Sequence, residues 1–207
     1  MKLATVLMAV ALVLAGSLTA LKADQPNGAG HVALAFTGGA TWTSASTGTC
    51  IWYLPVVGAL GVTAQGVSPA LFSDPNNPTI ETAYLIWVSD FGTVMLPGNG
   101  PVTQVLVPAG QATIYFSANP TTRDWSNRST WGQPVAVFVR DAGLLTSPDG
   151  FMSDSFIFSA DLASARTFML NGRPFNFRDL IPNGMTCFES GRNSSTTETG
   201  SCLAIGR

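Results

Sequence analysis

Residues 102–117 read VTQVLVPAGQATIYFS, with two mostly apolar segments on either side of a Pro-Ala-Gly turn. In the second segment, Gln111–Ser117, apolar side chains at every second position alternate with Thr, Tyr and Ser. An alternation with period two is typical of a β-strand that has one face on a hydrophobic core. Pro and Gly at the junction favour a turn. The stretch therefore predicts two β-strands connected by a short turn.

The same period of two recurs along much of the chain. Val residues occupy every second position of Val135–Val139, and Phe175 and Phe177 alternate with polar residues. Asn171-Gly172 lies between two such segments and is the strongest short hairpin signal in the chain. Thr79–Asp90 differs, because it carries large apolar groups on both faces. It predicts a central strand that is covered on both sides or that lines a pocket with one face.

The spacing of the turns indicates the fold class. Turn signals recur about every 8–12 residues, and no long segment shows helical periodicity. We therefore expect a single all-β domain over residues 31–207, an antiparallel β-sandwich, with a closed β-barrel as the alternative. The one helical segment we expect is a short turn at Asp161–Ala165.

The first 23 residues have the layout of a secretory signal peptide. Lys2 precedes the apolar run Leu3–Ala15, which is shorter than the roughly 20 residues that span a bilayer. The alternative is an uncleaved anchor. Three cleavage sites are expected from the small residues, after Ala15, Ala20 or Ala23. Residues 24–30 then form a flexible leader, and the mature chain, without a transmembrane span, is secreted, periplasmic or on the cell surface.

Three cysteines bear on the covalent structure. Export permits a disulfide, and two short segments around a polar loop carry Cys187 and Cys202. We expect these two residues to form a bridge. Closing a loop of about 15 residues with a disulfide stabilises a protein by about 3 kcal/mol in the chain-entropy model. Cys50, with apolar neighbours, would then be a buried free thiol, although the sequence also allows it to pair with one of the other two.

Composition and charge exclude several classes of function. The net charge is −2, and no Lys or Arg lies between Lys22 and Arg123. The chain therefore lacks the basic surface of a nucleic-acid-binding protein. His31 is the single histidine, so zinc sites built from several His ligands are excluded. A Ser-His-Asp triad could use only His31 as its base, and the chain contains no nucleophile-elbow motif.

Carboxylates are the remaining route to catalysis, because glycoside hydrolysis requires two of them. Glu81 and Asp90 flank the apolar strand but lie about 30 Å apart along an extended chain. Each would need a partner from elsewhere, such as Asp154 or Asp179. This gives the alternative function of a small extracellular carboxylate-dependent hydrolase.

Two turns carry oxygen ligands of the kind that calcium prefers. They lie at Asp74–Asn77 and at Asp149-Gly150 with Asp154. Neither matches the EF-hand loop, and Asp and Asn favour turns for backbone reasons alone. We therefore predict no cofactor, with calcium as the weaker alternative.

The segment Asn119–Gln133 predicts the binding surface. A polar loop of about 15 residues is unusual in a compact domain unless it has a function. Exposed aromatic faces stack on sugars or apolar ligands, and nearby polar groups donate hydrogen bonds. The predicted ligand-binding residues are Arg123, Trp125, Asn127, Arg128 and Trp131. The sequence thus favours a secreted non-catalytic module, which either binds an extracellular ligand such as a carbohydrate or is a structural surface protein. A further alternative is an envelope or surface assembly subunit.

Overall fold

The computed structural model describes residues 32–60, 62–63, 66–67, 70–98, 100–148, 153–191 and 197–205. The signal peptide, the leader and His31 lie outside these residues. The described strands are β1 (Val32–Trp42), β2 (Thr47–Val57), β3 (Val62–Thr63), β4 (Gly66–Val67), β5 (Leu85–Gly92), β6 (Val94–Met95), β7 (Thr103–Val107), β8 (Gly110–Phe116), β9 (Gln133–Arg140), β10 (Gly143–Ser147), β11 (Asp154–Ala165), β12 (Phe168–Leu170), β13 (Arg173–Phe175), β14 (Gly184–Gly191) and β15 (Glu198–Ala204). The described helices are η1 (Pro120–Thr122), η2 (Arg128–Thr130) and α2 (Phe177–Leu180). None of them has the length and apolar character to cross a membrane.

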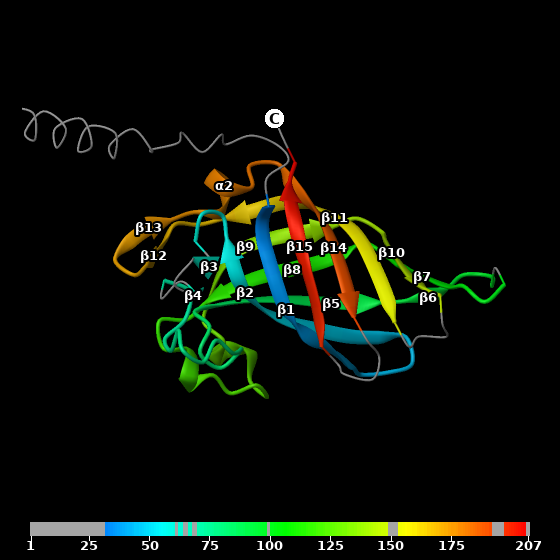
Figure 1. The fold of residues 1–207 in the computed structure, drawn as a ribbon, viewed down its shortest axis with the longest axis horizontal. Helices are drawn as coiled ribbons and strands as arrows, with labels where there is room; N and C mark the ends of the chain where they lie inside the picture. Colours follow the sequence, from blue (N-terminus) through cyan, green and yellow to red (C-terminus); the bar gives the residue numbers. More distant parts are fainter. Residues whose placement is uncertain are drawn as a thin grey trace, which may run out of the picture.

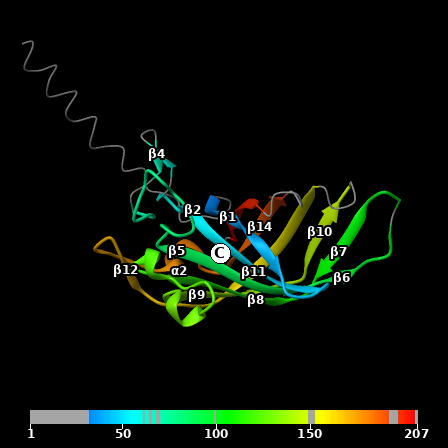
Figure 2. The same cartoon turned by 90° about the horizontal axis from the view of Figure 1, so that it is seen from below.

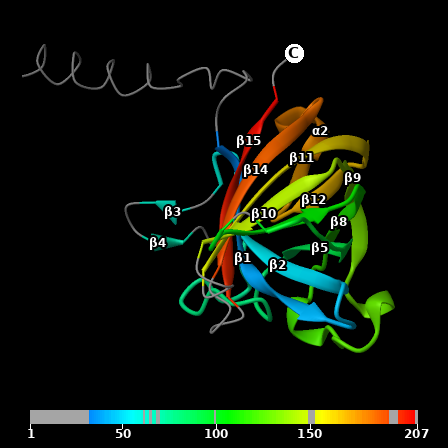
Figure 3. The ribbon, with the colours of Figure 1, turned by 90° about the vertical axis from the view of Figure 1, so that its right-hand side faces the viewer.

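Eight antiparallel strands form a closed barrel (Figures 1 and 3). Their order is β14-β15-β1-β2-β5-β8-β9-β11, and β11 pairs back onto β14 to close the ring. The prediction of an antiparallel all-β fold is confirmed. Of the two predicted architectures the barrel is correct and the sandwich is not, because the β11–β14 ladder removes the free edges that two separate sheets would have.

The barrel wall is extended at one end by β10, β7 and β6 (Figure 2). One edge of β11 pairs with β9 over Ala160–Ala165 and with β10 over Ser155–Ile157. The two strands predicted within residues 102–117 are β7 and β8, and they do not pair with each other. β7 belongs to the extension and β8 to the barrel, so the Pro-Ala-Gly turn carries the chain from one to the other.

The opposite end of the barrel carries the short elements that follow β11. The β12–β13 hairpin and α2 lie there and bring Phe168, Phe175 and Phe177 into ring contact. The hairpin at Asn171-Gly172 is confirmed, since both residues have positive φ, as a two-residue type I′ turn requires. The prediction of a helical turn at Asp161–Ala165 is wrong, because those residues continue β11 and pair with β9.

The central strand predicted at Thr79–Asp90 is β5, which begins only at Leu85 and lies between β2 and β8. Its residues Leu85 and Trp87 belong to the barrel core, whereas Ile86 and Val88 face outward and are also buried. The strand is therefore covered on both sides, as expected. Its outer cover is Trp131, a residue of the long polar loop.

Candidate functional site

Two residues of the predicted binding loop are structural anchors. The Arg123 guanidinium is buried and donates hydrogen bonds to four backbone carbonyls, those of Ile80, Ala83, Tyr84 and Trp131. The Trp131 indole is 3% exposed and donates to the carbonyl of Asp124 at 2.8 Å. These contacts fasten the loop to the barrel.

The other three predicted loop residues remain accessible. Trp125 is 36% exposed, and the Asn127 side chain accepts a hydrogen bond from the backbone of η2. Arg128 forms a bidentate ion pair with Asp90, one bond being 2.8 Å, and this pairing lowers the Asp90 pKa. The loop therefore presents Trp125, Asn127 and Arg128 to solvent, and ligand binding by this loop stays a prediction.

The carboxylates singled out in the sequence lie apart. Glu81 and Asp179 are exposed, and Asp90 is held by Arg128. The Asp74 carboxylate accepts the backbone N–H of Asn76, which gives this turn a structural role. Of the candidate partners, Asp154 lines a cavity, and Asp179 is not part of that lining.

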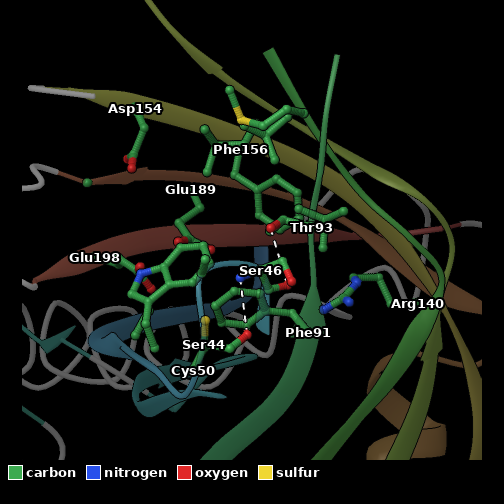
Figure 4. Close-up of a pocket in the computed structure, with 18 of the residues that line it drawn as sticks. Ser44, Ser46, Cys50, Phe91, Thr93, Arg140, Asp154, Phe156, Glu189 and Glu198 are labelled. Carbon is green, nitrogen blue, oxygen red and sulfur yellow. Dashed lines mark hydrogen bonds between the residues drawn. The ribbon is translucent and has the colours of Figure 1, made fainter. Parts of the chain in front are cut away.

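A cavity of about 700 Å³ occupies the open end of the barrel, between the barrel and the β6–β7–β10 extension (Figure 4). One part of its wall is apolar, and the side chains that form it are Ala40, Trp42, Phe91, Met95, Val105, Val107, Leu145 and Phe156. The polar part consists of Cys50, Arg140, Asp154, Glu189 and Glu198, with serines and a threonine from the β1–β2 turn and the end of β5. An apolar wall with a few convergent polar groups is typical of a small-molecule site.

The strand register places two glutamates together in this cavity. Cys187 lies directly opposite Cys202, and the predicted disulfide between them is present. Side chains alternate along a strand, so Glu189 and Glu198 share the inward face with the two cysteines. Glu189 is opposite Gly200 and Glu198 is opposite Gly191, so the two glutamates are diagonal neighbours, about 7–8 Å apart at the backbone and within reach of each other's side chains.

Glycine opposite each glutamate provides the space for this pair. A Cβ atom at position 191 would lie 2.8 Å from an oxygen of Asp154 and 3.3 Å from Cγ of Glu198. A Cβ atom at position 200 would overlap the ring of Phe36. Gly191 therefore leaves room for the side chains of Asp154 and Glu198, and Gly200 leaves room for the Phe36 ring in the core.

The two carboxyl groups share a hydrogen bond, which requires a proton on one of them. Burial raises the Glu189 pKa well above its ordinary value, and the negative charges of Glu198 and Asp154 raise it further. Burial also raises the Glu198 pKa, against the opposing effect of hydrogen bonds from Glu189, Trp52 and Cys50. One buried oxygen, Oε2 of Glu189, has no hydrogen-bond partner among the described residues.

Cys50 and Arg140 complete the polar part. Cys50 is not in a disulfide. Burial, followed by the charges of Glu198 and Glu189, raises the pKa of the Cys50 thiol. The Arg140 guanidinium is 3% exposed and donates to Ser89 Oγ at 2.7 Å and to the carbonyl of Pro108 at 3.2 Å. In Figure 4 it lies across the cavity from the glutamate pair.

Neither glutamate was singled out from the sequence, although a signal was present. Glu189 is two residues from Cys187, and Glu198 is four residues from Cys202. Even spacing within a strand puts residues on one face. A buried disulfide would therefore have pointed to both glutamates as inward-facing.

Comparisons with protein-family models, with curated proteins and with solved structures find no match to this chain. Within the described residues, no group of three or more His, Cys, Asp or Glu side chains is placed to hold a metal ion.

Proposed function

We propose that this protein is an exported binding protein that holds one small, largely apolar molecule inside its barrel. The observation that carries the proposal is the cavity of about 700 Å³, which is apolar on one side and has a buried carboxyl pair on the other. Eight-stranded barrels have interiors just wide enough for packed side chains or for one small ligand. Here the cavity with the carboxyl pair lies at the end next to the β6–β7–β10 extension.

The covalent structure and the first residues support the exported location. The Cys187–Cys202 disulfide is favoured in an oxidising compartment. The N-terminal charge and apolar run supply a signal for export. In this proposal the main ligand site is the barrel interior rather than the Asn119–Gln133 loop.

Filling the cavity tests the proposal. Leu145 lines it, whereas its neighbour Leu144 on β10 does not and points to the opposite face of the sheet. We expect the neutral apolar dye Nile red to bind the wild-type protein with increased fluorescence. Leu145→Trp should abolish this binding, and Leu144→Trp should retain it. Loss in both variants, or in neither, would contradict a site inside the barrel.

A second candidate is hydrolysis by the carboxyl pair. One protonated and one ionised carboxyl group in a shared cavity is the arrangement that acid–base catalysis uses, and the raised pKa values of Glu189 and Glu198 favour a proton held by this pair. Their direct hydrogen bond holds them closer than the roughly 5 Å separation of retaining glycosidases. This favours binding over hydrolysis. Turnover of aryl glycosides or aryl esters that is lost in both Glu189→Gln and Glu198→Gln would reverse that preference.

A role as an assembly subunit stays a prediction. The extension ends at β6, where Val94 and Met95 are at least half exposed. A strand edge of this kind can pair with another chain. Concentration-dependent oligomers in size-exclusion chromatography would support that role.

A further inference from the structure

The polar end of the cavity is acidic and has one unused acceptor. Asp154, Glu189 and Glu198 bring three carboxyl groups to the cavity wall, and Arg140 brings one cation. Glu198 already accepts hydrogen bonds from Trp52, Cys50 and Glu189. The Glu189 Oε2 atom is also buried but has no donor among the described residues. A buried acceptor without a donor is costly, so a ligand that brings a donor to the Glu189 carboxyl group gains affinity.

We propose that the cavity binds an apolar amine in its ammonium form, with an N–H group donating to the carboxyl group of Glu189. This inference rests on the proposed binding function and names the chemical class of its ligand. An ionised donor forms a stronger hydrogen bond with a carboxylate than a neutral donor does. The apolar part of the amine lies against the wall that includes Phe91, Val107 and Phe156.

The aromatic residues at the cavity also suit a cation. Trp42 and Phe91 pack edge to face with ring centroids 5.0 Å apart, and both line the cavity. Aromatic faces attract organic cations. A metal ion fits less well, because no group of three acidic, Cys or His side chains in the described part of the chain can hold one.

Binding displaces a proton. The carboxyl pair holds the proton of its shared hydrogen bond, and the charge of the incoming ammonium ion favours the ionised form of both groups, so that this proton leaves to solvent. The other titratable groups facing the pair are Asp154, Cys50 and Arg140. Cys50 stays a neutral thiol because burial raises its pKa, and Arg140 stays a cation. The affinity for an amine should therefore rise with pH through the range in which Glu189 titrates.

Three ligands of one chain length test the charge. We would measure the binding of octylamine, 1-octanol and octanoate to the full mature chain at pH 7 by isothermal titration calorimetry. Octylamine should bind about tenfold more tightly than octanol, because a charge-assisted hydrogen bond replaces a neutral one, and octanoate should bind most weakly. Titrations in two buffers of different ionisation enthalpy should show proton release with octylamine. Equal or tighter binding of octanol or octanoate would overturn the inference, and tight octanoate would identify Arg140 as the anchor.

A matched pair of variants locates the effect. In Glu189→Gln the preference for octylamine over octanol should fall from about tenfold to about equal. In Glu81→Gln, the same change at an exposed position outside the cavity, the full preference should remain. Far-UV circular dichroism checks that both variants are folded. If Nile red does not bind the wild-type protein, the proposed function fails; if Nile red binds but octanol equals octylamine, only this inference fails.

Discussion

The indole nitrogen of Trp52 donates a 3.0 Å hydrogen bond to Oε2 of Glu198, although their strands are not neighbours. β1 lies between β2 and β15 and places Gly38 opposite both residues. Because position 38 has no side chain, the indole and the carboxylate meet across β1. Trp52 also packs against Phe36 and Trp87 in the core. The hydrophobic core thus fixes the position of a carboxylate in the cavity.

Gly38→Ala should separate the two residues and destabilise the barrel. A Cβ atom at position 38 would overlap the carbonyl oxygen of Ile51 and lie 2.6 Å from Cα of Trp52. Overpacking of this kind costs about 1–3 kcal/mol, and we expect the upper end because the conflict is with backbone. Gly98→Ala is the control, since a Cβ atom there meets nothing within 4 Å. Urea unfolding measures both, and equal stability of the two variants would contradict this role for Gly38.

The carboxyl pair predicts the pH dependence of stability. Burial raises the Glu189 pKa above its ordinary 4.5, so the folded protein keeps a proton that the unfolded chain releases. The free energy of unfolding should therefore fall as the pH rises from about 4.5 through the raised pKa. Asp90 and Asp124 have lowered pKa values, and their effect appears at lower pH, where stability is lost as the pH falls.

Glu189→Gln should make this decline shallower. The amide carries no proton to lose, and only the smaller contribution of Glu198 remains. Urea midpoints between pH 5 and pH 8 measure the slope, and Glu81→Gln should keep the wild-type slope because its side chain is exposed. A wild-type midpoint that rises over this range would show that Glu189 is ionised in the folded protein.

Local parts of the fold could be predicted from the sequence, whereas barrel closure could not. The Asn171-Gly172 hairpin, the buried strand β5 and the Cys187–Cys202 bridge each depend on residues close in sequence or on a two-residue period. Such patterns show which face of a strand is buried but not which strand is its neighbour. The β11–β14 ladder that distinguishes the barrel from the sandwich joins distant segments, so it leaves no local signal.

The same limit applies to the site. Glu198 follows a polar segment that resembles a surface loop, and only the pairing of β15 with β1 and β14 turns its side chain into the cavity. Conversely, Arg123 and Trp131 have the composition of a binding surface, yet they are buried against the outer face of the barrel. Composition identifies chemical groups, whereas burial depends on tertiary contacts.

The two loop tryptophans should therefore differ in their effect on stability. Trp131→Ala should cost about 3–5 kcal/mol, as for other buried aromatic residues, because it uncovers Ile86 and Val88. Trp125→Ala should cost about 1 kcal/mol or less, since the side chain is partly exposed. Urea unfolding of the two variants measures the difference. Similar small costs for both would show that Trp131 is not an anchor, and would return the loop to consideration as a ligand surface.

The thiol of Cys50 reports on both the disulfide and the cavity. One free thiol per chain should titrate with 5,5′-dithiobis(2-nitrobenzoate) after unfolding in urea without reductant, because Cys187 and Cys202 are bridged. In the folded protein at pH 8 the reaction should be much slower, since burial raises the Cys50 pKa and the thiolate is the reactive form. Three reactive thiols in urea would refute the bridge. Because Cys50 lines the cavity, saturating Nile red should slow the reaction of the folded protein further, and an unchanged rate would place the dye elsewhere.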